Sequence, residues 1–193
     1  MRFIGSIFLA LSLLGCGGCV EKLSSGEVDS VVEEEVREWE MWDSCSQIPG
    51  DHPCNFSLSN QHGDAVELYD YYGKVVVIDL SAMWCGICQH IAAKGEEFTE
   101  TYGDENFAWL TILVENESGL APSQSDLQRW ADSYQLDGNI LGGDRSLVDP
   151  AGITGYPVSG WPTVVVIDRE MVVSNGVNGW SESLVTSWVE DLL

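Results

Sequence analysis

The chain has 193 residues and 45% of them are hydrophobic, which is enough for one domain with a buried core. Its 8 lysines and arginines stand against 31 aspartates and glutamates, giving a formal net charge of -23. This charge repels phosphate backbones and leaves no basic surface for them, so we expect no nucleic-acid partner.

Residues 1–15 have the pattern of an export signal. Arg2 is followed by an apolar or small run at residues 3–15, which is too short to span a bilayer and has the length of a signal-peptide core. The run ends in "LLGC", residues 13–16, which resembles a bacterial lipoprotein box. The resemblance implies cleavage before Cys16 and attachment of acyl chains to it, so that the mature protein is anchored to a membrane without crossing it.

The lipid site also predicts where the protein resides. We expect an exported lipoprotein on the periplasmic side of a bacterial membrane. The outer membrane is favoured in a cell that has two, because Gly17 and not an aspartate follows Cys16. The alternative is an ordinary cleaved signal in which Cys16 has no role.

Residues 16–44 are expected to form an acidic flexible tether. Between residues 20 and 44, nine acidic residues stand against two basic ones, and apolar periodicity is weak. Such a segment buries too little apolar surface to offset the entropy lost on ordering. We expect its end, at Trp39, Met41 and Trp42, to pack on a domain that spans residues 45–193.

Cys45 and Cys54 are expected to form a structural disulfide that pins the tether to the first strand. They lie nine residues apart, "PGD" between them favours a turn, and an exported protein meets an oxidising compartment. Two alternatives remain open: a metal site that includes His52, and a second redox pair that passes electrons to Cys85.

From residue 56 onward, strands alternate with helices. Residues 56–58 and 65–68 flank a polar turn with Gly63 and predict a hairpin. Apolar runs predict further strands at residues 75–80, 107–114, 163–168 and 171–174. Helical spacing predicts helices from just after Cys85 to near Gly103, at residues 123–136 and at residues 181–193. The order predicts an α/β fold, a central mixed sheet flanked by helices with an added N-terminal hairpin.

Cys85 and Cys88 lie where the strand at residues 75–80 gives way to a helix. A thiolate breaks a disulfide by in-line attack, and a second thiol must then resolve the mixed disulfide. Cys85 lies at the helix start, where unpaired N–H groups stabilise a thiolate, so we assign it as the nucleophile. Cys88, one turn further and shielded, is assigned as the resolving thiol.

Asp79 interrupts the apolar strand six residues before Cys85. A carboxyl group buried there would have a raised pKa and could accept the proton that Cys88 loses on resolution, directly or through water. The alternative is a strand-end residue that caps a loop.

Two segments and the hairpin carry a family resemblance. "DLSAMWCGIC", residues 79–88, resembles the active-site segment of the thioredoxin superfamily, and "GWPTVVVID", residues 160–168, is similar to the segment that carries its cis-proline. The hairpin and "LYDYYGKVVVIDL", residues 68–80, are similar to the membrane-anchored TlpA and ResA-like branch and to the related peroxiredoxins. The resemblance covers about residues 50–193. It implies a thioredoxin-like fold and a thiol-disulfide oxidoreductase that acts on protein thiols and disulfides, uses no cofactor besides its own cysteines, and is served by an upstream electron donor.

The resemblance also implies a substrate-binding surface. It places a cis peptide bond before Pro162, beside the sulfurs, so that the backbone of Trp161 can pair with a substrate strand. Tyr156–Pro157 is the other candidate for the cis bond, and Pro162 is preferred because a threonine and an apolar strand follow it directly. Trp84 is expected either to contact substrate or to pack. The isoleucine at position 87 stands where many relatives have proline.

The residues around Cys85 and Cys88 bear on three other functions: zinc binding, copper(I) transfer and peroxide reduction. A zinc site is disfavoured because a second cysteine pair at comparable spacing is missing. Met83, Cys85, Cys88 and His90 are soft ligands that could hold copper(I), which makes a copper-transfer module one alternative. A peroxiredoxin-like peroxidase is the other, but the resemblance requires a threonine three residues before the reactive cysteine, and Ala82 stands there.

Overall fold

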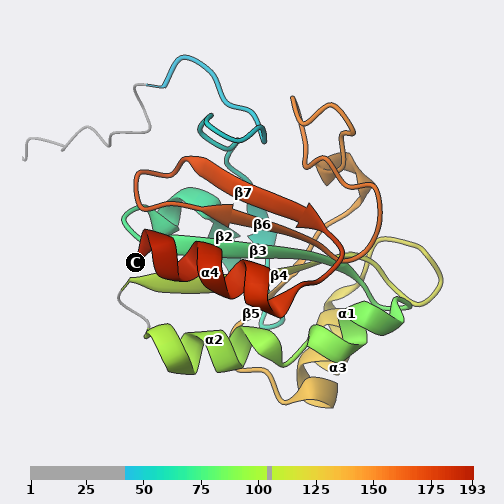
Figure 1. Ribbon diagram of the computed structural model, residues 1–193. Helices are drawn as coiled ribbons and strands as arrows, with labels where there is room; N and C mark the ends of the chain where they lie inside the picture. The colour runs from blue at the N-terminus through green and yellow to red at the C-terminus, as the bar shows by residue number, and fades with distance from the viewer. Residues whose placement is uncertain (1–41, 104–105) are drawn as a thin grey trace, which may run out of the picture. The chain divides into compact units, whose positions relative to one another are not determined.

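A five-stranded sheet with the strand order β5-β4-β3-β6-β7 forms the centre of the fold (Figure 1). The computed structural model describes residues 42–103 and 106–193, so Cys16, Trp39 and Met41 lie outside the described residues. The strands are β3 (Val75–Ala82), β4 (Phe107–Glu115), β5 (Asn139–Gly142), β6 (Thr163–Ile167) and β7 (Val173–Asn178). Neighbours β3, β4 and β5 run parallel, whereas β6 is antiparallel to β3 and β7. The sheet is therefore mixed, as the sequence predicts.

The hairpin expected at the N-terminal side is present as a separate two-stranded sheet. It consists of β1 (Ser57–Ser59) and β2 (Ala65–Glu67), followed by the 3-10 helix η2 (Leu68–Tyr71). Its buried residues Val66 and Leu68 belong to the same apolar cluster as Val76, Ile78 and Leu80 of β3. Because side chains alternate along a strand, the hairpin and η2 cover the face of the sheet that the even-numbered residues of β3 present.

Helices pack against the opposite face. They are α1 (Gly86–Ile91), α2 (Lys94–Tyr102), α3 (Gln124–Tyr134) and α4 (Glu182–Leu192), and a 3-10 helix η3 (Arg145–Leu147) follows β5. Val75 and Val77 of β3 share a cluster with Phe98 of α2 and Val185 of α4. No helix within residues 42–103 and 106–193 has both the length and the apolarity needed to cross a membrane.

The structure differs from the expected elements in three places. The single helix expected after Cys85 is two, α1 and α2, separated at Ala92 and Ala93. Strand β5 was not expected, because four residues are too short to show a period. The last strand begins at Val173 and not at residue 171, because Met171 occupies the turn with a φ of 56°.

Cys45 and Cys54 are joined by a disulfide, with their Cα atoms 4.8 Å apart. The bridged loop hydrogen-bonds to the first residue of β7: the Gly50 amide donates to the Val173 carbonyl at 2.8 Å, and the Val173 amide donates to the Asp51 carbonyl at 2.9 Å. The disulfide joins Cys45 to a residue three positions before β1, and the loop between the two cysteines is tied in addition to the edge of the central sheet.

We expect the Cys45→Ser/Cys54→Ser variant to fold with a lower melting temperature. Loop-closure entropy for about ten residues corresponds to at most roughly 2.7 kcal/mol, or about 5–10 °C for a domain of this size. The hydrogen bonds to β7 remain and hold the loop. Calorimetry of the oxidised protein measures the change. Alkylation under mild reduction, mapped by mass spectrometry, is the companion test: equal labelling of Cys45 and Cys85 would favour the electron-relay alternative.

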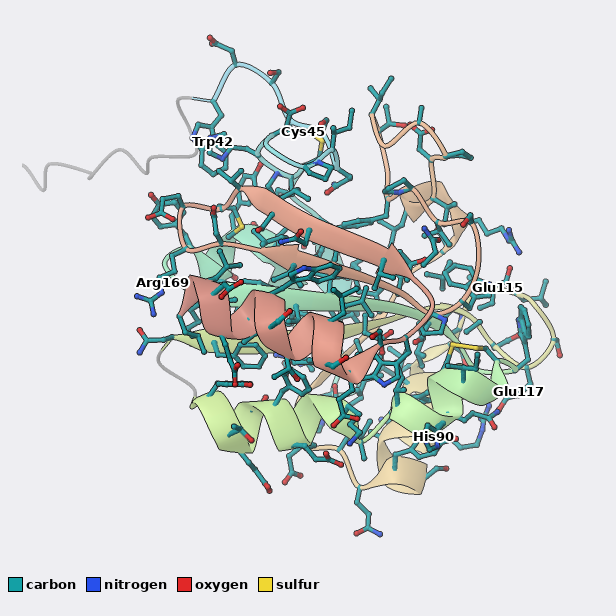
Figure 2. All side chains as sticks on the ribbon, in the orientation of Figure 1. Trp42, Cys45, His90, Glu115, Glu117 and Arg169 are labelled. Atoms are coloured by element: carbon teal, nitrogen blue, oxygen red, sulfur yellow. A yellow bond between two sulfur atoms is a disulfide. The ribbon has the colours of Figure 1, made fainter. Side chains whose placement is uncertain are left out.

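The end of the tether packs on the domain at Trp42. Its ring stacks on His52 with centroids 3.7 Å apart and meets Tyr69 edge-on at 5.3 Å. Nδ1 of His52 lies 2.7 Å from the carbonyl oxygen of Met171. His52 is therefore engaged by an aromatic ring and a backbone oxygen. Figure 2 shows Trp42 and Cys45 on the same side of the fold.

Candidate active site

The two active-site cysteines lie at the point where β3 ends and α1 begins. Cys85 is the N-cap residue of α1, and a disulfide joins it to Cys88 with their Cα atoms 5.2 Å apart. The Cys85 sulfur accepts a hydrogen bond from the Cys88 amide at 3.2 Å. Cys85 retains 7% exposure, whereas Cys88 has none. Cys85 is thus the more accessible of the two cysteines, and a backbone donor is in place at its sulfur to stabilise a thiolate.

The peptide bond before Pro162 is cis, and Trp161 belongs to the loop that carries it. Trp161 packs against the buried cluster that contains Cys85 and Cys88. The loop is therefore adjacent to the dithiol although Pro162 lies 74 positions after Cys88 in the sequence. Of the two bonds considered from the sequence, this is the one that is cis.

Asn178, at the end of β7, braces the cis-proline loop. Its Oδ1 accepts from the Thr163 hydroxyl at 2.8 Å and from the Ser159 amide at 2.6 Å. The Gly179 amide donates to the carbonyl of Pro162 at 2.7 Å. Sequence reasoning did not find Asn178, because a polar residue at the end of a strand carries no distinctive pattern.

Asp79 lies inside the central strand and is 1% exposed, so it caps no loop. The Ser81 hydroxyl donates to its Oδ1 at 2.7 Å. Burial raises the pKa of Asp79 from 3.8 to about 7, and hydrogen bonds from Ser81 and Thr111 oppose part of that rise. A carboxyl group with this pKa exchanges its proton near neutral pH, as an acid–base group requires.

Trp84, the residue before Cys85, is held by a buried carboxylate. Its indole N–H donates to Oε2 of Glu115 at 2.8 Å, while half of the Trp84 surface remains exposed. Glu115 is 3% exposed and forms an ion pair with Arg145 of η3. The register of β3 shifts between Ser81 and Ala82, which places Ala82 opposite Glu115. The sequence analysis missed Glu115; its signal is an acidic residue that ends an otherwise apolar strand.

We expect Glu115→Ala to weaken binding of protein disulfides, because it frees the Trp84 indole beside the reactive sulfur. The KM for a protein disulfide should rise about five- to tenfold, as a loss of about 1 kcal/mol of binding free energy would give. Steady-state kinetics with a protein disulfide and with a small aromatic disulfide measure the difference. Glu190→Ala is the matched control, since Glu190 of α4 accepts a hydrogen bond from Tyr102 and does not contact Trp84. A KM unchanged by Glu115→Ala would separate Trp84 from substrate binding.

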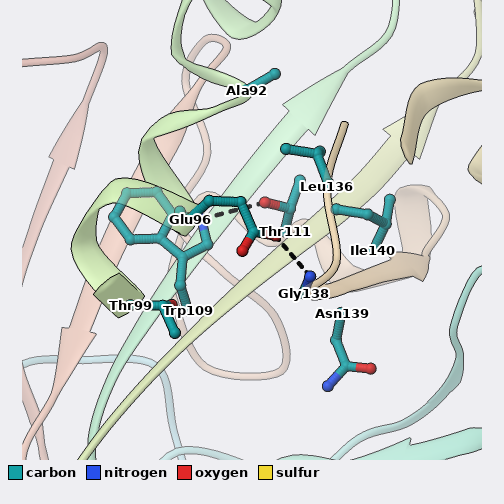
Figure 3. Close-up of a pocket in the computed structure, with 10 residues that line it drawn as sticks. Ala92, Glu96, Thr99, Trp109, Thr111, Leu136, Gly138, Asn139 and Ile140 are labelled. Carbon is teal, nitrogen blue, oxygen red and sulfur yellow. Dashed lines mark hydrogen bonds between the residues drawn. The ribbon is translucent and has the colours of Figure 1, made fainter. Parts of the chain in front are cut away.

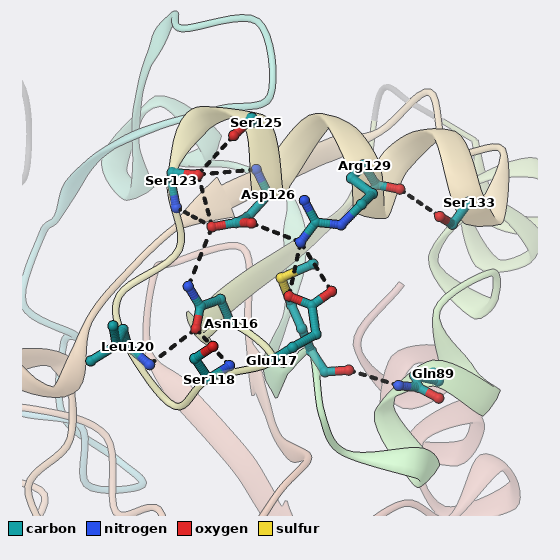
Figure 4. A network of polar contacts seen from close by, with 11 residues as sticks. Gln89, Asn116, Glu117, Ser118, Leu120, Ser123, Ser125, Asp126, Arg129 and Ser133 are labelled. Atoms are coloured by element: carbon teal, nitrogen blue, oxygen red, sulfur yellow. Dashed lines mark hydrogen bonds and ion pairs between the residues drawn. The ribbon is translucent and has the colours of Figure 1, made fainter.

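The loop after β4 is fixed beside α1 by polar contacts (Figure 4). Arg129 of α3 bonds both carboxylate oxygens of Glu117, at 3.0 and 2.8 Å, and Oδ1 of Asp126 at 2.7 Å. Gln89 of α1 donates to the carbonyl of Met83 at 2.7 Å, next to Trp84. These contacts order the rim of the dithiol site on the side of α3.

The soft ligands considered for copper(I) differ in burial. His90 is exposed on α1 (Figure 2), whereas Met83 is 3% exposed in the core. Within the part of the chain that the structure describes, no group of three or more His, Cys, Asp or Glu side chains is arranged to hold a metal ion.

A mixed sheet, a dithiol at the start of the helix that follows its central strand, and an adjacent cis-proline define a thioredoxin-like thiol-disulfide oxidoreductase. The chain belongs to the AhpC/TSA family, whose model matches residues 49–175. Thioredoxin-like protein YneN of Bacillus subtilis (strain 168) is 28% identical over 127 residues, which cover 65% of this chain and 69% of YneN.

Two solved structures share the fold. One, assigned as the thiol:disulfide interchange protein DsbE of Chlorobium tepidum, is 26% identical with a TM-score of 0.60 and covers 77% of this chain and 100% of that chain. The other is the exposed lipoprotein thioredoxin Etrx1 of Streptococcus pneumoniae strain TIGR4, 26% identical with a TM-score of 0.56, covering 72% of this chain and 100% of that chain. Proteins of this class use their own cysteines as the redox group.

Proposed function

We propose that the protein is a lipid-anchored, extracytoplasmic oxidoreductase that reduces or exchanges disulfides in protein substrates. The observation that carries the chemical part of this proposal is the difference between the two sulfurs. Cys85 retains 7% exposure and has a backbone N–H donor at its sulfur, whereas Cys88 has no exposure and lies one turn away.

The first step is attack on a substrate disulfide. The Cys85 thiolate forms a bond to one substrate sulfur, and the other substrate sulfur leaves as a thiolate, which yields a mixed disulfide. The Cys88 amide, 3.2 Å from the Cys85 sulfur, favours the ionised form before attack. Cys85 is thus the nucleophile in this proposal.

The second step resolves the mixed disulfide. Cys88 gives its proton to Asp79 and attacks the Cys85 sulfur, so the Cys85–Cys88 disulfide forms and the second substrate thiolate leaves. The structure contains the pair in this oxidised state. An external thiol donor must then return two electrons to the pair before another disulfide is reduced.

The surface around Cys85 suits an extended, partly apolar substrate. Trp84 is 50% exposed and Ile87 is 54% exposed, on either side of Cys85 in sequence. Trp161 and Pro162 supply a backbone segment next to the sulfurs, where a substrate strand can pair by β-augmentation. Two exposed apolar side chains and a strand-pairing loop favour a protein over a small polar disulfide.

Peroxide reduction is disfavoured within the AhpC/TSA family membership. Ala82, which is fully buried three residues before Cys85, has no hydroxyl group for a peroxide. The deciding experiment compares insulin reduction driven by dithiothreitol, peroxide consumption, and titration with copper(I). Turnover of insulin with neither peroxide turnover nor tight copper binding supports the proposal; fast peroxide turnover or tight copper binding without insulin reduction would replace it.

The proposal also includes a lipid anchor at Cys16 and a location on the outside of the cytoplasmic membrane. The apolar run at residues 3–15 and the "LLGC" box support an exported lipoprotein acylated at Cys16, with residues 16–44 as tether and residues 45–193 as the domain. Etrx1, similar over 72% of this chain, is itself described as an exposed lipoprotein. The outer membrane is favoured in a two-membrane cell because Gly17 follows Cys16.

We expect Cys16→Ser to abolish lipidation and remove the protein from the membrane fraction or leave it unprocessed, because the acyl chains supply the anchoring free energy. Fractionation with metabolic labelling by a fatty acid measures both effects. Cys19→Ser is the matched control, since it removes a nearby cysteine outside the box. A Cys16→Ser protein that is still processed and fully membrane-bound would contradict the lipoprotein assignment.

A further inference from the structure

A second residue bonded to Asp79 lies on the neighbouring strand. Asp79 of β3 and Thr111 of β4 are register partners, and the Thr111 hydroxyl hydrogen-bonds the Asp79 carboxyl group. Val75 and Val77, which share the side of β3 with Asp79, pack against α2 and α4. Asp79 and Thr111 therefore meet beneath the helices, on the face opposite the hairpin.

Trp109 determines the direction in which the Thr111 hydroxyl group donates its hydrogen bond. Its indole N–H donates to Oγ1 of Thr111 at 3.1 Å, in a buried contact (Figure 3). An indole N–H can only donate, whereas a hydroxyl group has one proton and two lone pairs. Because Trp109 occupies one lone pair, Thr111 is oriented to donate its own proton to the ionised carboxylate of Asp79.

The position of Trp109 is itself fixed by α2. A Cβ atom added to Gly95 would lie 2.6 Å from Cδ1 of Trp109, so the indole edge rests directly on the helix backbone. Trp109 and Thr111 both border a small cavity of about 20 Å³ between α2 and the sheet. This volume is close to that of one water molecule, and the polar side chains of Glu96, Thr99 and Asn139 also line the cavity.

The neighbours of Asp79 on β6 and α4 are apolar. In register, β6 contributes Val164, and α4 packs on this face through apolar side chains. Among the titratable groups of the helices, the thiol of Cys88 in α1 is buried, and Oε1 of Glu96 in α2 accepts from the Gly138 amide at 2.6 Å. His90 is exposed, and Lys94 of α2 pairs with Glu97 at 2.7 Å and with Glu182 of α4 at 3.3 Å. Burial therefore has the largest effect on the charge of Asp79, and the hydrogen bonds from Ser81 and Thr111 oppose it.

We infer that Thr111, held by Trp109, is a positioning residue that stabilises ionised Asp79 and so sets the pH range in which Asp79 accepts the proton of Cys88. The inference rests on the proposed role of Asp79 in resolution. It assigns a task to two residues of β4 that the dithiol motif does not include. Without the Thr111 donor, the carboxyl group would hold its proton to higher pH and resolution would slow at neutral pH.

The test follows the two thiol-release phases when the reduced protein reacts with a small aromatic disulfide, by stopped flow from pH 5 to pH 9. The first phase reports attack by Cys85 and the second reports resolution. Thr111→Val, which removes the hydroxyl and keeps the shape, should slow the second phase about tenfold at neutral pH and move its midpoint up by about one pH unit. Thr111→Ser should restore the rate to within about twofold of the original protein.

Two further variants separate positioning from packing. Trp109→Phe removes the indole donor together with part of the ring volume, and it should shift the midpoint in the same direction by a smaller amount. Thr99→Val is the matched control, since Thr99 borders the same cavity from α2 and should leave the profile unchanged. A carbon-13 NMR titration of the Asp79 carboxyl group should give the same order of midpoints.

The outcomes also distinguish the inference from the proposed function. In an Asp79→Asn background, Thr111→Val should cause no further slowing. If it slows resolution there by the same factor, or slows it without moving the midpoint, Thr111 acts through packing and the inference is wrong while the role of Asp79 stands. If Asp79→Asn alone leaves the second phase unchanged, the proposed role of Asp79 fails and the inference fails with it.

Discussion

Cys85→Ser should abolish disulfide reduction, and Cys88→Ser should convert the protein into a trap that holds its substrates as mixed disulfides. Attack requires only the Cys85 thiolate, whereas release requires the second thiol to reach the same sulfur. Because Cys88 is fully buried, an external thiol replaces it slowly. We expect turnover of insulin to fall to background in both variants, with covalent adducts in Cys88→Ser alone.

Non-reducing electrophoresis and mass spectrometry of the trapped adducts measure this difference. Cys45→Ser/Cys54→Ser is the matched control, because it removes a disulfide that lies outside the active-site cluster. Adducts should form at Cys85 and be released by dithiothreitol. Undiminished turnover in Cys88→Ser would show that resolution does not need the second thiol.

Asp79→Asn should stabilise the oxidised protein at neutral and alkaline pH. Burial raises the pKa of Asp79 from 3.8 to about 7, so between these values the unfolded chain ionises while the folded protein does not. The contribution of Asp79 to stability is therefore fully present below about pH 4 and is lost as the pH rises to about 7. At 1.36 kcal/mol per pH unit, the difference between 3.8 and about 7 gives about 4 kcal/mol as an order of magnitude.

Urea unfolding of the oxidised protein at pH 4, 6 and 8 measures the effect. The gain from Asp79→Asn should be small at pH 4, intermediate at pH 6 and largest at pH 8. Asp64→Asn, at an exposed position of the hairpin turn, is the matched control. An equal gain at all three pH values would mean that shape or packing, and not ionisation, causes the stabilisation.

The same substitution should slow resolution. The amide keeps the shape of Asp79 but accepts no proton, so the second thiol-release phase should fall about a hundredfold at neutral pH and less at alkaline pH, where solvent base removes the proton of Cys88. Greater stability together with slower resolution would be the combined signature of a buried acid–base group.

The local sequence determined the class of fold and the position of the dithiol. Apolar runs and helical spacing identified β3, β4, β6, α3 and α4, because those segments are long enough to show a period. A shorter element left no such signal: β5 has four residues and becomes a strand only by pairing with β4. The break between α1 and α2 was missed for a related reason, since Ala92 and Ala93 are both good helix formers.

The sequence also identified Asp79 as a candidate, because a single acidic residue inside an apolar strand is expected to be buried, and burial of a carboxyl group is costly unless it has a role. It could not identify what controls that residue. Thr111 lies 32 positions away by the difference of residue numbers, and only the parallel pairing of β3 with β4 makes the two partners. The contact between Glu115 and Trp84 likewise depends on strand pairing, because the register of β3 and β4 shifts at the end of β3.

The local sequence thus determined which residues carry out the thiol chemistry. The tertiary structure decided which residues control the charge of Asp79. A dithiol works through its own spacing along one helical turn, so Cys85 and Cys88 can be recognised from four consecutive positions. The charge of a buried carboxyl group depends instead on every donor within hydrogen-bond reach. Those donors come from neighbouring strands, whose register is set by the packing of the whole sheet.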